Sequence, residues 1–326
     1  YQVPLIKTAK KLGLYTIVVS IPGNYPGFEL ADKVYYENTV DDEKILEIAK
    51  EEQIDGIITT GTDVCVITIG KVCDAMGLAG LSYEAAQIAV DKMLMKTKYE
   101  EYGVRTARFR KVLFSDPDIK KTIEGLEFPL IFKSVDSSGS RGITRVDSYD
   151  KFDSAMDYVK ENTRKDYFLI EEFVEGEEFG AQAFVYNGEV QFILPHGDYV
   201  FHGDTGVPIG HFAPYNLNED VFDYYEKILR TALGENPRFP LDKPFVPNAS
   251  HLLMSDKDGI IKSQVDHNEP NEDICEVEFD YKPGDEVHKF HVGPHRIGHI
   301  ITKGETLEDA QKLLFEAMDK VEITVE

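Results

Sequence analysis

The sequence is poor in three features that define large classes of protein: cysteine, long apolar runs and basic side chains. Its 326 residues contain three cysteines and no C-x-x-C pattern, which is too few for a disulfide framework. No apolar run approaches the roughly 18 residues that a membrane-spanning helix needs, and no cationic-then-apolar signal peptide opens the chain. These absences predict a cytoplasmic protein without a membrane partner.

Basic residues are the scarcer charge, since 35 Lys and Arg against 59 Asp and Glu give a formal net charge of −24. Nucleic acids and anionic membranes attract clustered basic side chains, so neither is expected as a main partner. A local basic pocket for a phosphate group is compatible with this balance. The hydrophobic content of 42% is enough for packed cores in two or three compact units.

The first 80 residues alternate between strand and helix patterns, which is typical of a parallel sheet in an α/β fold. Runs rich in β-branched residues predict strands at 16–20, 33–37 and 56–60. Residues 41–53 predict a helix with an acidic first turn. The sequence opens on a helical pattern, although such sheets normally start on a strand, so we expect the first strand to be missing.

A second set of strands and helices follows. Asn187-Gly188 between alternating runs predicts a hairpin. The other expected elements are strands at 128–133, 167–172, 258–264, 276–280 and 297–302, a helix at 149–162 and a closing helix at 306–320.

Residues 128–146 carry the strongest signal for anion binding. A strand delivers Lys133, a loop of small residues follows, and a second strand resumes at Ile143. Small residues let backbone N–H groups approach an anion, and the side chains of Lys133 and Arg141 suit phosphate oxygens. The alternative is a flexible hairpin with a surface lysine, because this is not a Walker A loop and no helix follows it.

Residues 167–180 form a second candidate. An apolar strand ends in Glu171 and Glu172, passes Phe173 and Val174, and the chain returns past Glu178. Such a crossover offers backbone groups to a purine edge and a carboxylate to ribose hydroxyls. An acidic surface hairpin is the alternative interpretation.

Together these stretches resemble the ATP-grasp superfamily, specifically its carboxylate–amine ligases related to phosphoribosylglycinamide synthetase and carbamoyl-phosphate synthase. The order of the Asp91-Lys92 pair, the Lys133 loop, the 171–174 hinge and the closing 296–310 segment matches over nearly the whole chain. The resemblance implies an α/β ATP-grasp fold with an N-terminal Rossmann-like (pre-ATP-grasp) parallel-sheet domain. The implied divisions are 1–85 for that domain, 86–240 for the ATP-grasp module with a lid at about 105–172, and 241–326 for the C-terminal portion.

The resemblance also implies a function. The activity would be ATP-dependent carboxylate–amine ligation through an acyl phosphate, releasing ADP and phosphate. ATP and Mg²⁺ would be the cofactors, a small-molecule carboxylate and an amine the substrates, and a homodimer one expected assembly. The nucleotide-binding positions that carry over are two lysines (Lys92, Lys133), the phosphate loop (Ser138, Gly139, Ser140, Arg141, Gly142), the adenine hinge (Glu171, Glu172, Phe173, Val174) and the ribose carboxylate (Glu178).

Residues 195–211 contain three histidines and two aspartates without a regular period, and we expect a long loop. Related ligases have a similar segment near the acceptor substrate. The resemblance therefore assigns four residues to the substrate side: His196, Asp198, His202 and His211. A metal cluster is the alternative, although no ligand spacing here is diagnostic.

A second group of histidines is expected to have no common role. His291, His295 and His299 recur every four residues, which on a helix would form one metal-binding face. Gly293-Pro294 and Gly298 would break such a helix, so we expect unrelated loop and strand residues.

The family's metal element, Glu-x-Asn or Glu-x-Gly-Arg, is not found where it should occur, so the catalytic and metal-binding residues are left unassigned. We expect several tens of residues to be missing near Val221 and Phe222. Glu276 and Glu278 have a similar spacing but lie too late in the chain. Either the chain is a degenerate relative that binds ATP as a regulatory or scaffold protein, or the sequence joins segments that are separate in the natural protein. We favour the second, because loss of a central sheet segment would expose the core.

Overall fold

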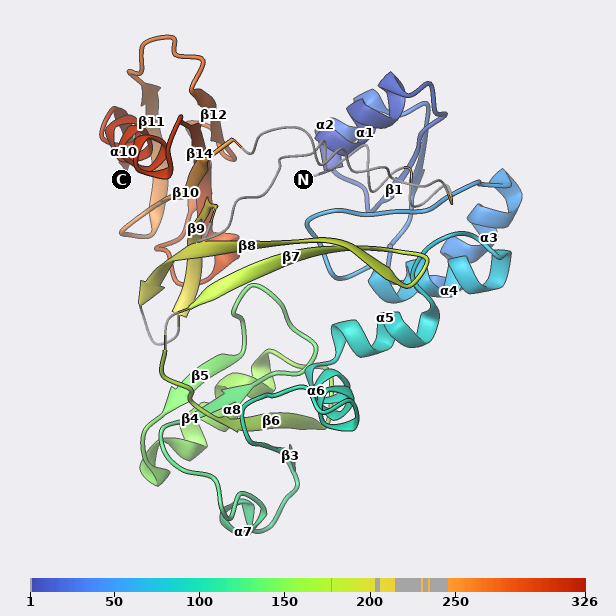
Figure 1. Cartoon of the computed structure of the whole chain (residues 1–326), viewed down its shortest axis with the longest axis vertical. Helices are drawn as coiled ribbons and strands as arrows, with labels where there is room; N and C mark the ends of the chain where they lie inside the picture. Colours follow the sequence, from blue (N-terminus) through green and yellow to red (C-terminus); the bar gives the residue numbers. More distant parts are fainter. Residues whose placement is uncertain (1, 177, 203–205, 215–229, 231–233, 235–245) are drawn as a thin grey trace. The chain divides into compact units, whose positions relative to one another are not determined.

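The computed structural model describes residues 2–176, 178–202, 206–214, 230, 234 and 246–326. The chain forms two compact units, Tyr1–Thr106 with Phe222–Pro240 and Ala107–Val221 with Leu241–Glu326. Figure 1 follows the elements in chain order from blue to red. No helix in the described part of the chain combines the length and the apolar composition that crossing a bilayer requires.

The first unit contains a parallel pair of strands, as the sequence predicts. Strands β1 (Ile17–Ser20) and β2 (Lys33–Tyr36) pair in parallel over their whole length. The prediction of a third strand at 56–60 is wrong: these residues form none, and the backbone of Thr60 bonds instead to the side-chain amide of Gln2. β-Branched composition favours an extended chain, but a strand also needs a paired neighbour.

Helices fill the rest of this unit. Asp41 caps α3 by accepting a hydrogen bond from the Lys44 N–H at 3.1 Å, and apolar residues of α3 pack against Val72 of α4. The helices are α1 (Gln2–Lys11), α2 (Pro26–Leu30), α3 (Asp42–Glu52), α4 (Val66–Met76), α5 (Tyr83–Val90) and α6 (Lys92–Glu101).

The second unit begins with a four-stranded antiparallel sheet in the order β3-β6-β4-β5. Its strands are β3 (Phe109–Leu113), β4 (Leu130–Lys133), β5 (Ile143–Val146) and β6 (Tyr167–Glu172). The short helix α7 (Ile119–Thr122) follows β3 in the chain, and the turn η1 (Tyr149–Lys151) leads into α8 (Phe152–Glu161). Phe132 and Phe168 are fully buried against α8. Because strand side chains alternate, Lys133 and Glu171 face the opposite side of this sheet.

A six-stranded antiparallel sheet follows, in the order β12-β14-β10-β9-β8-β7. Its strands are β7 (Phe179–Tyr186), β8 (Glu189–His202), β9 (Gly206–Ala213), β10 (Asn248–Met254), β12 (Ile274–Phe279) and β14 (Arg296–Lys303). Three further strands, β11 (Gly259–Asp266), β13 (Glu286–Val287) and β15 (Val321–Val325), form a separate sheet in the order β13-β11-β15.

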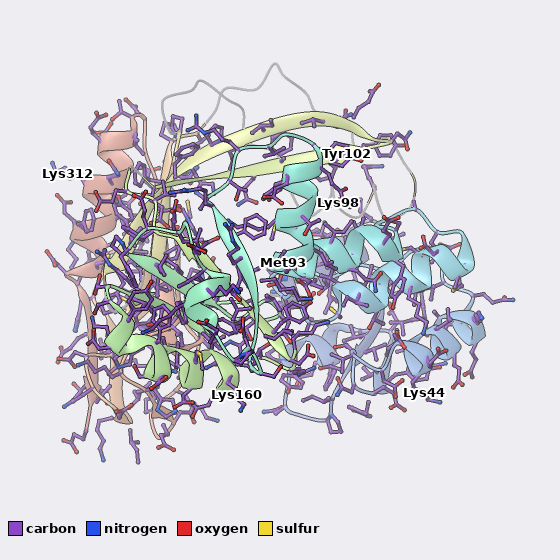
Figure 2. The ribbon with its side chains drawn as sticks, turned by 90° about the horizontal axis from the view of Figure 1, so that it is seen from below. Lys44, Met93, Lys98, Tyr102, Lys160 and Lys312 are labelled. Carbon is purple, nitrogen blue, oxygen red and sulfur yellow. The ribbon has the colours of Figure 1, made fainter. Side chains whose placement is uncertain are left out.

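Helix α10 (Leu307–Met318) covers one face of the six-stranded sheet. A capping box between Thr306 and Asp309 starts it, and Leu314 packs into the core with Ile300 of β14. Lys312 lies on the side of α10 that points away from the sheet, as Figure 2 shows. On the opposite face, polar side chains such as His299 lie beside Leu252, which packs against the buried Val207, Ile209 and Phe290.

The prediction of a long loop at 195–211 is wrong. Residues 195–202 belong to β8 and residues 206–211 to β9, which pair from Gly197–Phe212 to His202–Gly206 with one register shift after Tyr199. Glycine in this stretch marks a close approach of backbones: a Cβ on Gly210 would lie 2.2 Å from the carbonyl oxygen of Ser250. Composition alone could not distinguish this from loop glycine.

Candidate active site

Lys133 lies where β4 ends, beside the end of its neighbour β6. Ile131 pairs with Glu171 across the two strands, so Lys133, two residues on, lies diagonally opposite Glu171 on the same face. Its ammonium group forms an ion pair with the Glu171 carboxylate; the side chains are 26% and 7% exposed respectively. The Glu171 carboxylate orients the Lys133 ammonium group at the end of the strand, and an ammonium group in such a position can bind an anionic ligand.

The loop after Lys133 has an unusual backbone. Gly139, Ser140 and Gly142 all have φ between 60° and 66°, in the left-handed region. A Cβ at Gly142 would lie 2.6 Å from the Ser134 hydroxyl, which donates to the Arg141 carbonyl at 3.1 Å. The loop is thus braced at its base, and consecutive left-handed residues can direct N–H groups to one side, as in anion-binding loops.

Arg141 turns back on the loop. Its Nε donates to the carbonyl oxygen of Ser138 at 3.0 Å, which folds the side chain across Gly139 and Ser140. Its guanidinium is exposed there, and its remaining N–H groups can serve a phosphate. The five predicted loop residues, Ser138 to Gly142, therefore lie together at the end of β4.

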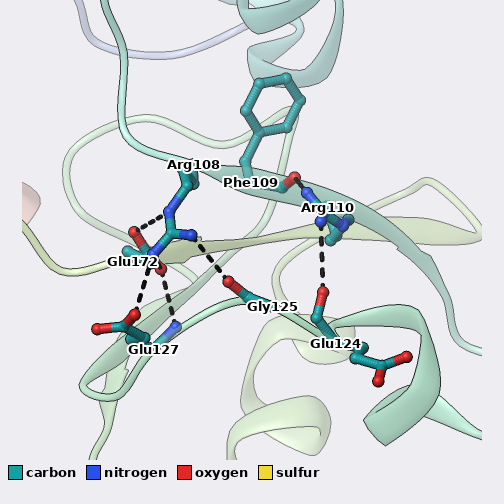
Figure 3. Close-up of polar contacts among 7 residues, drawn as sticks. All are labelled: Arg108, Phe109, Arg110, Glu124, Gly125, Glu127 and Glu172. Atoms are coloured by element: carbon teal, nitrogen blue, oxygen red, sulfur yellow. Dashed lines mark hydrogen bonds and ion pairs between the residues drawn. The ribbon is translucent and has the colours of Figure 1, made fainter.

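The predicted adenine hinge leaves β6 at Glu172. Figure 3 shows how Arg108 holds the carboxylate of Glu172: Nε of Arg108 donates to Oε2 at 2.8 Å, and Nη2 lies 2.6 Å from Oε1. The Glu127 N–H also donates to Oε1 at 2.8 Å, and Arg108 donates to the Gly125 carbonyl at 3.0 Å. Glu172 thus anchors the hinge within the four-stranded sheet, and the following Val174 is 69% exposed.

The charge state of Glu172 follows from these contacts. Partial burial by itself would raise its pKa, but the Arg108 hydrogen bonds and the Glu127 N–H outweigh burial and lower the pKa below its ordinary value. Glu172 is accordingly ionised at neutral pH. Sequence reasoning missed Arg108, which lies 64 residues from Glu172, because nothing local marks their pairing.

Three of the four predicted substrate residues come together on the six-stranded sheet. Asp198 and His211 are cross-strand partners on β8 and β9, and His196 lies two residues from Asp198 on the same face. Nδ1 of His196 and Nδ1 of His211 lie 2.8 Å and 2.6 Å from the same Oδ1 of Asp198. We call these three residues the histidine–aspartate cluster. The fourth, His202, ends β8, and its side chain lies outside the described residues.

The histidine–aspartate cluster is closed by hydrogen bonds. Gln182 on β7 lies 3.3 Å from Nε2 of His196, and an amide donor there leaves Nδ1 of His196 to donate to Asp198. Asp198 and His196 are largely buried, whereas the His211 side chain is 54% exposed. His211 is therefore the member that a ligand can reach.

Two predicted nucleotide residues lie apart from these groups in the chain. Glu178 directly precedes β7, and a Cβ at Gly206 would lie 3.6 Å from its Oε2. Lys92 is the first residue of α6 in the other unit, where Asp91 caps the helix by accepting from the Met93 and Leu94 N–H groups. The expected break at Val221–Phe222, where the family's metal element is missing from the sequence, lies outside the described residues.

The structure brings together one group that the sequence reasoning kept apart. His295 ends the short η2 turn (Gly293–His295) and His299 lies in β14, which confirms that the recurring histidines share no helix. His299 instead faces Glu276 and Glu278 on β12. Both segments were predicted as strands, but their pairing register could not be read from either one.

Two parts of the chain match known protein families. Residues 126–231 match the model of an ATP-grasp domain, and residues 251–326 match that of the L-amino acid ligase C-terminal domain 2. The fold is therefore α/β of the ATP-grasp class, as the sequence predicts. Within that class, the chain carries an ATP-grasp domain followed by an L-amino acid ligase C-terminal domain.

Individual relatives agree with this assignment. The chain is similar to phosphoribosylglycinamide synthetase from Anaerococcus prevotii, with 28% identity, a TM-score of 0.77, and coverage of 100% of this chain and 97% of that one. It also shares its fold with an L-amino acid ligase from Bacillus licheniformis, with a TM-score of 0.82, 16% identity, and coverage of 99% and 95%.

A curated relative, alanine--anticapsin ligase of Bacillus subtilis (strain 168), is 25% identical over 262 residues, which is 72% of this chain and 55% of that protein. The chain thus spans about half the length of the curated relatives it matches. The activity of a whole ligase is accordingly taken up as a proposal below.

Proposed function

We propose that the chain acts in an ATP-dependent carboxylate–amine ligase that works through an acyl phosphate and releases ADP and phosphate. Its similar proteins include an alanine--anticapsin ligase and a phosphoribosylglycinamide synthetase. The observation that carries the proposal is the Lys133–Glu171 pair, which joins the base of a left-handed loop to the start of the hinge.

The roles of the nucleotide-binding residues are those that the resemblance to ATP-grasp ligases implies. Lys133 would contact the α-phosphate and the N7 side of adenine, and the 138–142 loop would close over the β- and γ-phosphates. The hinge from Glu171 to Val174 would bind the adenine edge, and Glu178 the ribose hydroxyls. Lys92 would be the first of the two nucleotide lysines, and Lys133 the second.

These residues fit a nucleoside triphosphate on chemical grounds. Small residues and left-handed backbone suit phosphate oxygens, and Arg108 holds the hinge through Glu172, so the hinge backbone is fixed before a purine arrives. Mg²⁺, which accompanies ATP in such chemistry, offsets phosphate repulsion.

The reaction itself needs no side-chain nucleophile. A carboxylate oxygen of the first substrate attacks the γ-phosphorus, the bond to the β–γ bridging oxygen breaks, and ADP leaves. The amine nitrogen then attacks the acyl carbon, the phosphate leaves with its bonding pair, and the amine gives up a proton. The chain's own residues bind, orient and exclude water during these steps.

The histidine–aspartate cluster is proposed for the substrate side, together with His202. Asp198 holds both rings through one oxygen, so the exposed His211 keeps a fixed orientation toward an incoming ligand. The cluster thus offers oriented polar groups to a small acid or amine. A cytoplasmic location and a homodimer belong to the same proposal.

The test is ADP release measured against a panel of amino acids and other carboxylates, each with and without an amine acceptor. A pair of substrates that raises ADP release above the ATP-only rate supports the ligase. A flat panel with ATP still bound would mean a nucleotide-binding protein without turnover. If ATP does not bind, the assignment of the nucleotide site fails as well.

A further inference from the structure

A second cluster of titratable side chains lies on the six-stranded sheet, outside every residue proposed for the ligase site. Glu276, Glu278 and His299, here called the glutamate–histidine cluster, lie on the face opposite α10. Glu278 and His299 are cross-strand partners of β12 and β14, and Glu276 is two residues away on the same face. The three side chains therefore converge from two paired strands.

The spacing of the donor atoms is that of ligands around a cation. Nε2 of His299 lies 3.2 Å from Oε2 of Glu276 and 3.8 Å from Oε2 of Glu278, and the three donor atoms lie within 4.8 Å of one another. Two ligands at about 2.1 Å from a tetrahedral ion are separated by about 3.4 Å.

The histidine–aspartate cluster shows the contrasting case. Its donors lie 2.6 Å and 2.8 Å apart, which are hydrogen-bond distances. An ion there would have to separate the carboxylate from both rings, whereas in the glutamate–histidine cluster it would have to break one hydrogen bond, between His299 and Glu276 at 3.2 Å.

The charges around the glutamate–histidine cluster give a second, independent reason. The acids before and after the cluster in the chain each form an ion pair with a basic side chain: Asp273 lies 3.6 Å from Lys303, and Asp280 lies 2.8 Å from Arg296. Between them, the two glutamates face one imidazole, and within the described residues no lysine or arginine forms an ion pair with either. One N–H on Nε2 can serve only one carboxylate. A bound cation would balance the second.

We propose that Glu276, Glu278 and His299 bind a divalent transition-metal ion, with Zn²⁺ as the representative. One imidazole nitrogen and two carboxylate oxygens are a zinc-type ligand set that leaves a fourth position open. Mg²⁺ is disfavoured, since it prefers oxygen ligands and retains its waters. None of the three residues is among those proposed to bind the nucleotide, so the test needs no nucleotide.

The structure also sets the expected strength. Binding through Nε2 places the ring proton on Nδ1, which is buried and has no hydrogen-bond partner among the described residues. Sites whose histidine lacks such a partner bind metal about 10–100-fold more weakly than sites that have one. A moderate affinity is therefore expected.

The experiment is Zn²⁺ binding to the nucleotide-free full chain, measured by competition with a chromophoric chelator. Wild type should bind one Zn²⁺ more than His299→Gln, and the Glu276→Gln/Glu278→Gln double variant should bind that ion at least tenfold more weakly. Excess Mg²⁺ should not displace it. The glutamates are 48% and 56% exposed, so the double variant should keep the fold, which circular dichroism checks.

The matched control is His288→Gln. His288 also lies 3.2 Å from a carboxylate, that of Asp258, and its ring lies 5.4 Å from that of His295, but within the described residues no three ligand atoms gather there, so this variant should bind like wild type. Asp198→Asn tests the other cluster. Equal binding by wild type and His299→Gln would overturn the proposal, as would loss of the ion from Asp198→Asn alone.

Discussion

Replacing Lys133 by alanine should cost both stability and nucleotide affinity, for two separable reasons. The substitution removes the ammonium group beside a carboxylate whose side chain is only 7% exposed. Breaking a fully buried pair costs about 3–5 kcal/mol, and the 26% exposure of Lys133 reduces this to about 2 kcal/mol. In a unit of this size that corresponds to a fall of roughly 4–8 °C in the unfolding midpoint.

The second effect falls on ATP. Losing one charge-assisted hydrogen bond to a phosphate, about 1.5–3 kcal/mol, should weaken ATP binding by roughly 10–150-fold. The double variant Lys133→Ala/Glu171→Gln separates the two, because it removes both charges. It should regain most of the lost stability while its ATP affinity stays low.

Thermal unfolding and calorimetric titration with ATP measure the two quantities. If Lys133→Ala unfolds at the wild-type midpoint, the ion pair does not stabilise the sheet. If the double variant regains ATP affinity together with stability, Lys133 acts only through the fold, and the nucleotide site proposed above is in the wrong place.

Three further predictions test the fold. Gly210→Ala would place a Cβ 2.2 Å from a backbone oxygen of β10 and should lower the free energy of unfolding, measured in denaturant, by about 2–3 kcal/mol. Gly176→Ala is the control: a Cβ there would have no other atom within 4 Å, so the free energy of unfolding should not change. Burial lowers the pKa of His251 below its ordinary 6.5. The free energy of unfolding should therefore be highest above pH 6.5 and fall as the pH drops through the pKa of His251 in the folded state. His251→Gln should flatten this pH dependence, and an unchanged slope would contradict the prediction. Hydrogen bonds from Lys10 and then from Thr16 lower the pKa of Asp32 to about 2. The stabilisation that the Asp32 carboxylate provides should therefore be complete above pH 3.8 and vanish toward pH 2. Asp32→Asn should accordingly destabilise the protein at pH 7 but progressively less below about pH 4.

Local patterns in the sequence predicted much of the architecture. The β-branched runs around β1 and β2, the Asn187-Gly188 turn and the Thr306 cap each specify structure through neighbouring residues, and the structure has these elements. The 138–142 loop is likewise visible in the sequence because small residues and a lysine follow one strand directly.

Contacts between distant strands could not be predicted in the same way. Residues 195–211 were expected to form a loop because their glycines interrupt the alternation of apolar and polar residues that is typical of a strand. The strands β8 and β9 are recognised only from their pairing with each other and with β10. The meeting of His299 with Glu276 and Glu278 depends on the register of β12 against β14, which is set by the packing of Val277 and Ile300 under α10 rather than by local residues.

The alternation of the six-stranded sheet gives the chain two independent sets of positions. Residues that point toward α10 determine whether the sheet folds, whereas those on the opposite face, such as His211 and His299, contribute little to that core. Substitutions at exposed positions of the second face, such as His211, can therefore alter what the sheet binds at little cost to folding, whereas Leu252 on that face packs against the buried Val207, Ile209 and Phe290. A single scaffold of this kind can diversify its ligands by changing alternate residues of the same strands, without moving any strand.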